Sequence, residues 1–492
     1  MNGSQVGPIH SNPTPKESPE KQISIGYNNA MPKRIPYDVV YLILTKALHT
    51  PLLPHPNYDL FECETMFSSR CCSDILRRES ERLARTLRLV CREWNELVPK
   101  LQPRLMVYEN RPLGEENMPP HVLYRPGPGT LSEAHRLEIN QLGLCRRRQF
   151  NKCPAPSSCR YFKWALTQAP ILENLSSRAI PSFILTFRME QLQVLVSNYI
   201  QSNGMNKEIL DRMPSLKAIW WPGGGGDTFL ADLTHHPVHT QLTHLRISLK
   251  WDQFTQLVDP IHFPDLRYLA LLISGRTDEQ PPLFSAEKMK WAIFPRLHTL
   301  QFRAYFVSVT SEYFYSFLTA CRSTLSSLIL HDVSSQSLPD SVPLPDISRL
   351  YNLFPHLTAF GPNLDVLYLN PPPPPSSHPP MVLVVHPLIY RYSSLNITVD
   401  ARIASLIQAC HDWGKSEIRF LDTWQEATTL VQDDIDFYFT NRAFYIPFQL
   451  KFYDRSEQSG VTIRDRDGSL ITSPQGEAFI QALRERWAMD LV

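Results

Sequence analysis

The sequence predicts an α/β protein in which a small all-helical module precedes a long array of strand-and-helix repeats. Two observations carry this prediction: helical apolar patterns between residues 35 and 105, and a leucine pattern that recurs 24 to 39 residues apart between residues 216 and 369. Strands joined by return helices pair in parallel. The 492 residues exceed what one ordinary domain core fills, so we expect at least two structural units.

Composition excludes several classes of protein. The chain is 43% hydrophobic and 20% charged, and its formal net charge is +1, which gives no global field to attract nucleic acid or an anionic membrane. No stretch approaches the ~18 uninterrupted apolar residues of a membrane helix. Nine scattered cysteines are typical of reduced thiols. We therefore expect a cytoplasmic or nuclear protein with neither nucleic acid nor membrane as a partner.

The N-terminal region begins with residues 1–32, which are rich in Pro, Ser, Asn and Lys and predict a disordered tail without a secretory signal. A helical module follows at residues 33–105. Its first helix, "RIPYDVVYLILTKAL", has Pro36 in the first turn and Asp38 near the positive end of the helix dipole. Apolar side chains cover more than half of its circumference, which predicts a second, partner-facing surface.

The stretch "LARTLRLVCREWNELVPKL" predicts one amphipathic helix from Leu83 to Leu101. Apolar residues recur every three or four positions, as expected of a core-facing stripe. The stripe consists of Leu83, Leu87, Val90, Trp94, Leu97 and Leu101. The opposite face is charged, and Leu89 stands on it as an exposed apolar side chain.

These helices resemble the F-box, a three-helix module that docks on the S-phase-kinase-associated adaptor of cullin-based ubiquitin ligases. Ile35-Pro36 stands where the family usually has Leu-Pro, "VVYLIL" matches its first helix, and "LRLVCREWNEL" is similar to its Val-Cys-x-x-Trp helix. Residues 50–80 depart from the family, with a Pro-containing inserted loop in place of a short middle helix.

The resemblance implies a set of adaptor-facing positions, some of them shared with the core of the module. They are Ile35, Pro36, Val39, Ile43, Leu44, Leu89, Val90 and Trp94. The alternative is a plain helical hairpin packed on the next domain.

Beyond a connecting segment, residues 106–159, the region 160–492 carries Leu-x-x-Leu-x-Leu or a close variant six times. The pattern occurs at Leu216-Ile219-Trp221, Leu242-Leu245-Ile247, Leu266-Leu269-Leu271, Leu297-Leu300-Phe302, Leu325-Leu328-Leu330 and Leu364-Leu367-Leu369. Each strand points alternate residues inward, and stacking of repeats supplies the core. Less regular strands are expected at 395–397, 418–420 and 448–452.

These units resemble the irregular leucine-rich-repeat region of F-box proteins, especially the large families of fungi. The resemblance implies a solenoid whose strands line a concave, partner-binding face. The residues that project from that face would be Trp220, His244, Arg246, Ser248, Tyr268, Thr299, Gln301, Arg303, His331 and Tyr368. Aromatic residues and Arg are frequent interface anchors, so Trp220, Arg246, Tyr268, Gln301, Arg303, His331 and Tyr368 are the candidate substrate-binding residues. An ordinary α/β domain with leucine-rich strands is the alternative, and it too has a parallel sheet.

Motifs for catalysis, metal or cofactor binding are weak. The glycines of "WWPGGGGDTF" lack a phosphate-binding motif, and Pro237 interrupts the histidines of "THHPVHTQLTH". "RDRDGSLIT" lacks the outer acidic ligands of a calcium loop and predicts a hairpin turn. The Pro-rich loop 371–380 predicts a polyproline II spacer, which could also be a docking site for an SH3-type or WW-type domain. We therefore expect no catalytic residue, metal or cofactor.

The resemblance as a whole implies a non-catalytic substrate receptor. The module would bind the S-phase-kinase-associated adaptor of an SCF-type, cullin-based ubiquitin ligase complex, and the repeats would hold a target protein that the sequence does not identify. Two alternatives stay open. One is a ligase-independent protein-interaction scaffold whose helices cap the solenoid. The other is an enzyme in the region after Pro380, where the repeat signal weakens.

Overall fold

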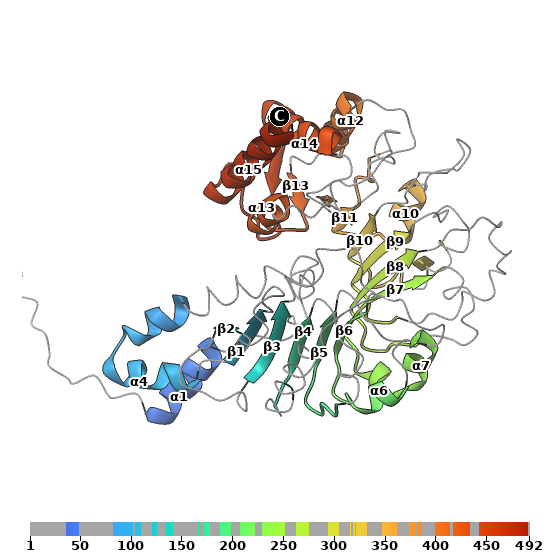
Figure 1. The fold of residues 1–492 in the computed structure, drawn as a ribbon. Helices are drawn as coiled ribbons and strands as arrows, with labels where there is room; N and C mark the ends of the chain where they lie inside the picture. Colours follow the sequence, from blue (N-terminus) through green and yellow to red (C-terminus); the bar gives the residue numbers. More distant parts are fainter. Residues whose placement is uncertain are drawn as a thin grey trace, which may run out of the picture.

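The computed structural model shows a helical module followed by one long curved sheet with helices against it (Figure 1). The structure describes residues 36–48, 82–101, 104–109, 121–124, 134–140, 166, 171–177, 187–197, 207–221, 229–250, 262–274, 294–304, 315, 318–319, 321–331, 347–361, 373–379, 381–385, 399–413, 417–432 and 442–490. The predicted tail (1–32) and inserted loop (50–80), together with Ile35 and Tyr368, lie outside these residues.

The N-terminal module packs α1 (Tyr37–Leu48) against α4 (Arg92–Leu101) and a helical stretch at residues 82–88. Its buried core consists of Leu44, Ala84, Leu97 and Val98, with Val40, Leu87 and Trp94 packed against it. The prediction of one continuous helix from Leu83 to Leu101 is wrong, because the chain turns at residues 89–91.

This turn changes which side chains face the core. The amide of Leu89 donates to the carbonyl of Thr86, and the amide of Val90 donates to that of Leu87, so the chain tightens before α4 begins. Val90, predicted as a core residue, is instead 58% exposed. Leu89 is 86% exposed, which confirms its predicted position on the surface.

Within the part of the chain that the structure describes, the sheet has fourteen strands, and from β3 to β14 their order in space follows their order in the chain. Every neighbouring pair is parallel except β1 and β2. The strands are β1 (Arg104–Glu109), β2 (His121–Tyr124), β3 (Ala134–Asn140), β4 (Asn174–Ser177), β5 (Val194–Ser197), β6 (Ala218–Trp221), β7 (His244–Lys250), β8 (Tyr268–Ser274), β9 (Thr299–Ala304), β10 (Ser327–His331), β11 (Ala359–Gly361), β12 (Val382–Val385), β13 (Glu417–Phe420) and β14 (Thr462–Arg464). A doubly wound sheet reverses its strand order at a switch point, whereas this run does not, so the α/β fold is solenoid-like.

The repeated leucines lie in register on one face of the sheet. Leu245 pairs with Ile219 on one side and Leu269 on the other, and Leu300 continues the same column to Leu328. These side chains belong to one continuous core cluster that extends from Leu137 to Leu483. Each repeat thus completes the core of its neighbours, as expected for a stacked array.

Backbone hydrogen bonds just before each strand fix this register. The amide of Thr243 donates to the carbonyl of Lys217 at 2.8 Å, and the amide of Arg267 donates to that of Thr243 at 2.8 Å. The amide of His298 donates to the carbonyl of Arg267 at 2.9 Å. Because a one-residue slip would turn every leucine to the other face, this ladder preserves the apolar column.

The helices are shorter in the middle of the array than at its C-terminal end. They are α6 (Lys207–Asp211), α7 (Phe229–His235), the 3-10 helix η3 (Pro237–Thr240), α10 (Ile347–Leu353), α12 (Val399–Asp412), α13 (Trp424–Gln432), α14 (Arg442–Gln458) and α15 (Pro474–Asp490). In Figure 1, α6, α7 and α10 lie outside the arc of strands. Among the described helices, none is long and apolar enough to cross a membrane.

The C-terminal end confirms one predicted strand and corrects another. The strand expected at residues 418–420 is β13. The strand expected at 448–452 is wrong, because these residues lie within α14. There Phe452 contacts Tyr453, whose ring packs edge-on against Trp424 and Phe479. This aromatic cluster from three helices outweighs the local strand preference of the aromatic residues.

Candidate functional site

The N-terminal module presents an unusual amount of exposed apolar side chain. We call this set the module surface; it comprises Tyr37, Val39, Tyr41, Leu42, Ile43, Leu83, Leu89 and Val90, all exposed. On α1 the rings of Tyr37 and Tyr41 lie 6.4 Å apart. Single exposed apolar residues are normal, but a small module that exposes this many has a surface suited to a protein partner.

The structure divides the predicted adaptor-facing residues between surface and core. Pro36, Val39, Ile43, Leu89 and Val90 are exposed. In contrast, Leu44 is fully buried in the module core, and Trp94 is half-buried against it. A partner can therefore touch the first five directly, while Leu44 and Trp94 fix the helices that carry them.

Four predicted substrate-binding residues lie on one face of the sheet, opposite the leucine core; we call it the strand face. In the strand register Trp220 pairs with Arg246, and Ala270 separates Arg246 from Gln301. Tyr268 occupies the neighbouring column, beside His244. Arg303 and His331 pair with each other on β9 and β10, but the placement of their side chains lies outside the described residues.

The side chains of the strand face contact one another. The guanidinium carbon of Arg246 lies 4.3 Å from the centroid of the Trp220 ring, in a cation–π arrangement. The Tyr268 hydroxyl donates to Oε1 of Gln301 at 3.0 Å. The His244 ring stacks on that of Tyr268 at 6.1 Å. These contacts hold the polar groups in fixed orientations.

Burial along the strand face is uneven. Tyr268, Gln301 and His244 are buried, whereas Trp220 and Arg246 are half-buried. Burial, with a smaller contribution from the charge of Arg267, lowers the pKa of His244 to about 3. The Trp220–Arg246 pair is thus the more open part of the face, where a partner would meet side chains first.

An apolar layer on the strand face was missed by the sequence prediction. The buried cluster there consists of Val194, Val196, Ala218, Tyr268, Ala270, Ile329, Ala359, Val384 and Leu421, with Trp220 and Val382 packed against it. Its signal was present in the sequence, because these residues alternate with the core leucines along their strands. Strands that are apolar on both faces are typical of covered parallel sheets.

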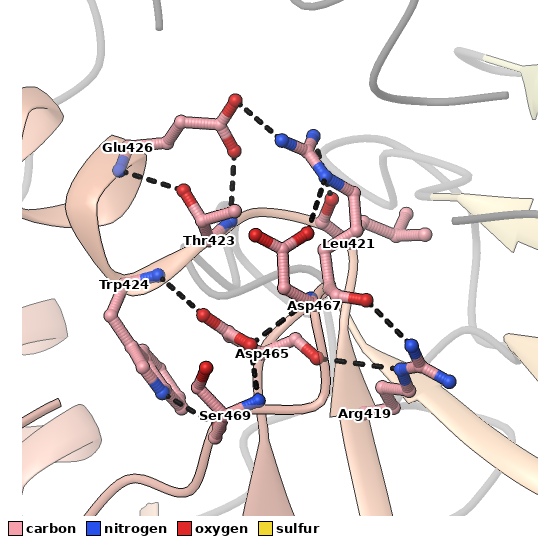
Figure 2. A network of polar contacts seen from close by, with 9 residues as sticks. Arg419, Leu421, Thr423, Trp424, Glu426, Asp465, Asp467 and Ser469 are labelled. Carbon is pink, nitrogen blue, oxygen red and sulfur yellow. Dashed lines mark hydrogen bonds and ion pairs between the residues drawn. The ribbon is translucent and has the colours of Figure 1, made fainter. Parts of the chain in front are cut away.

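A buried polar network lies at the C-terminal end of the sheet (Figure 2). Thr423 and Glu426 form a capping box at the start of α13: the amide of Glu426 donates to the Thr423 hydroxyl at 3.1 Å, and the amide of Thr423 donates to the Glu426 carboxylate at 2.8 Å. Arg466 donates to the other oxygen of Glu426 at 2.7 Å. The "TWQE" signature of this box was readable in the sequence and was missed.

Asp465 organises the terminal hairpin beside this box. Its carboxylate accepts hydrogen bonds from the amides of Trp424, Asp467 and Ser469 at 3.1, 3.0 and 2.7 Å. Arg464 and Leu470 form an antiparallel bridge, and Gly468 adopts a positive φ of 82°, so the predicted hairpin turn is confirmed. Burial raises the pKa of Asp465 above its usual value, although these amide bonds oppose the rise.

The chemistry of the network is structural. The carboxylates of Asp465 and Glu426 are occupied by backbone amides and by Arg466, which joins three segments of chain. Among the described residues, no group of three or more His, Cys, Asp or Glu side chains could hold a metal ion. The histidines of "THHPVHTQLTH" do not converge on one site. Nε2 of His236 lies 3.0 Å from Oδ1 of Asp211, whereas His244 lies on β7.

The module surface and the strand face are therefore the candidate functional sites. No family model, curated protein or solved structure matches the chain.

Proposed function

We propose that the chain is a substrate-recognition adaptor of a cullin-based ubiquitin ligase. The N-terminal module binds the S-phase-kinase-associated adaptor, and the strand face of the repeats binds a target protein. The observation that carries the proposal is the exposure of the module surface, above all Leu89, which is 86% exposed in a turn between two helical segments.

The small size of the module core, compared with its exposed apolar surface, supports a partner at this surface. Among the described residues of the module, the buried core consists of Leu44, Ala84, Leu97 and Val98, while Tyr37, Val39, Tyr41, Leu42 and Ile43 of α1 are exposed. Burial of apolar area contributes roughly 25 cal/mol per Å², so covering these side chains would stabilise a complex considerably. A module that served only as a solvent-facing cap would gain from polar residues at the same positions.

The mechanism of such a receptor is proximity. Holding a target beside a charged conjugating enzyme raises the effective concentration of the reacting groups, and the receptor itself forms and breaks no bond. The strand face suits the holding role because its half-buried Trp220–Arg246 pair offers an aromatic ring and a guanidinium on a rigid sheet. These are residue types that dominate binding energy at interfaces.

The test is co-expression of the full chain with the S-phase-kinase-associated adaptor, followed by measurement of complex formation. We expect the wild type to bind, and Leu89→Lys to bind at least tenfold more weakly because it places a charge in an apolar contact. The matched control is Gln481→Lys, which adds the same charge at an exposed position of α15. Failure of the folded wild type to bind, or equal binding by Leu89→Lys, would overturn the proposal.

A ligase-independent scaffold is the second candidate, and one observation favours it. The helix α4 ends at Leu101, just before β1 begins at Arg104, so the module joins the β1–β2 end of the sheet, where helices could shield the end of the array. In this case the wild type would not bind the adaptor, and substitutions at Trp220 and Arg246 would still weaken binding of a target. The co-expression experiment therefore separates the two functions.

A further inference from the structure

The segment between β11 and β12 contains five consecutive prolines, Pro371–Pro375, of which the structure describes Pro373 onward. Each proline fixes its own φ near −65° and restricts the residue before it to extended conformations. Successive prolines therefore favour a polyproline II helix, which has three residues per turn and no internal hydrogen bonds. This conformation exists before any partner binds, so binding it costs little conformational entropy.

His378 fixes the C-terminal end of the prolines on the solenoid. Its Nε2 lies 3.1 Å from the carbonyl oxygen of Phe354, just after α10, and its ring lies 5.7 Å from that of Tyr351. Its backbone amide donates to the carbonyl of Pro375 at 2.8 Å. The segment is thus attached to a repeat and is not a free linker at this end.

The attachment leaves two edges of the polyproline helix accessible. Pro374 is half-buried, whereas Pro373, Pro375 and Ser376 are exposed. Because successive residues of this helix occupy three different edges, the edge of Pro374 faces the protein and the edges of Pro373 and Pro375 face outward. Domains that recognise polyproline take such proline rings into grooves lined by aromatic side chains.

The surroundings of the prolines restrict the kind of groove that fits. Residues 366–390 contain no Lys, Arg, Asp or Glu. A partner that needs an ion pair next to the prolines finds none in this stretch. The available contacts are proline rings, which pack on aromatic faces, and backbone carbonyls, which accept hydrogen bonds.

We infer that Pro373–Pro375 is a docking site for a protein domain with an aromatic-lined polyproline groove of the WW or EVH1 type, one that binds without an ion pair. The inference rests on the segment between β11 and β12 alone and is independent of the adaptor-binding module. It gives the chain a third partner, held on the solenoid between its middle and its C-terminal helices.

The test measures binding of the full-length chain to purified WW, EVH1 and SH3 domains fixed on a surface. We expect binding by WW or EVH1 domains, and at least a tenfold loss in Pro373→Ala/Pro375→Ala, which corresponds to about 1.4 kcal/mol. The matched control, Pro214→Ala/Pro295→Ala, changes two exposed prolines of other repeats and should bind like the wild type. If the double variant unfolds at a lower temperature, the single variant Pro373→Ala replaces it.

The inference is overturned if no WW or EVH1 domain binds the wild type, or if the folded proline variant keeps its affinity. Binding by SH3 domains alone would also overturn it, because the groove would then be of another kind. Leu89→Lys should bind these domains like the wild type, so failure of the adaptor proposal leaves this result unaffected.

Discussion

Arg466 and Glu426 form an ion pair at 2.7 Å in which the two side chains are only 2% and 4% exposed. The pair links the terminal hairpin to the first turn of α13. Removing two charges from water costs free energy. Their mutual attraction offsets this desolvation penalty only when the geometry is good and the remaining polar groups are hydrogen-bonded. Here Glu426 also accepts the amide of Thr423, and Arg466 also donates to the carbonyl of Leu421 at 3.4 Å.

Glu426→Gln should therefore destabilise the C-terminal unit strongly. The substitution keeps the size of the side chain but leaves the Arg466 charge buried without its carboxylate, a situation that costs about 3–5 kcal/mol. Hydrogen exchange of peptides that cover residues 420–432 and 462–471 measures the local opening free energy. We expect faster exchange in both segments, because the ion pair joins them.

Two further variants test the cause of this effect. Glu485→Gln removes an exposed carboxylate from α15 and should change exchange little. The double variant Glu426→Leu/Arg466→Met removes both charges together and should recover much of the lost stability. Unchanged exchange in Glu426→Gln would show that the pair contributes nothing to the stability of this end.

His244 should make the middle of the sheet sensitive to acid. Its pKa is lowered from an ordinary value of 6.5 to about 3 by burial and by Arg267. Between these values the unfolded chain binds a proton that the folded chain does not, so the free energy of unfolding falls as pH falls from about 6.5 toward 3. This contribution changes by up to about 1.4 kcal/mol per pH unit.

The measurement is the urea midpoint of the wild type and of His244→Phe at a series of pH values. Phe preserves a ring beside Tyr268 but cannot be protonated, so the variant should lose less stability in acid. Well above pH 6.5 the histidine is neutral in both states, and any difference there reports packing alone. Parallel curves for the two proteins down to pH 4 would contradict the assignment.

The repeats were predictable from the sequence because their signal is periodic and local. Leu242, Leu245 and Ile247 already show which residues of β7 face the core, and the same spacing recurs in β8, β9 and β10. The repeat predicted at residues 364–369 lies outside the described residues. The curvature of the sheet and the burial of Tyr268 depend on contacts with neighbouring strands, which are distant in the sequence. For this reason the strand face was predicted as a solvent-open surface, whereas part of it is a packed apolar layer.

The break before α4 could not be predicted from the helical wheel. The apolar spacing of three and four residues continues through Val90, although the chain leaves the helix at residues 89–91. The spacing shows which residues are apolar. It does not show whether each backbone hydrogen bond of the helix forms. Similarly, residues 448–452 have the composition of a strand, but contacts among Phe452, Tyr453, Trp424 and Phe479 determine their helical conformation.

Gly476 should tolerate no side chain at the start of α15. A Cβ at this position would lie 2.1 Å from the carbonyl oxygen of Ile471, which is backbone and cannot rotate away. Gly476→Ala should therefore destabilise by about 1–3 kcal/mol or more, as in other overpacked sites. The midpoint of thermal unfolding of the full chain measures the effect.

Gly460→Ala provides the contrast for this prediction. Gly460 has open space around its Cβ position but a positive φ of 71°, so alanine there costs backbone strain of roughly 1–2 kcal/mol without any clash. We expect Gly476→Ala to lower the unfolding midpoint more than Gly460→Ala does. The reverse order would mean that the chain near Ile471 moves readily to accept a methyl group.

Leu44 and Leu89 allow the same substitution to separate the two roles of the N-terminal module. Leu44 is fully buried, so Leu44→Ala should cost about 2–5 kcal/mol and accelerate hydrogen exchange in α1 and α4. Leu89 is 86% exposed, so Leu89→Ala should change stability by less than about 0.5 kcal/mol. If the module surface binds a partner, Leu89→Ala must nevertheless weaken that complex, because the same apolar side chain becomes buried on binding. A loss of stability in Leu89→Ala, with binding unchanged, would instead place Leu89 in an intramolecular contact and remove the main support for an adaptor-binding module.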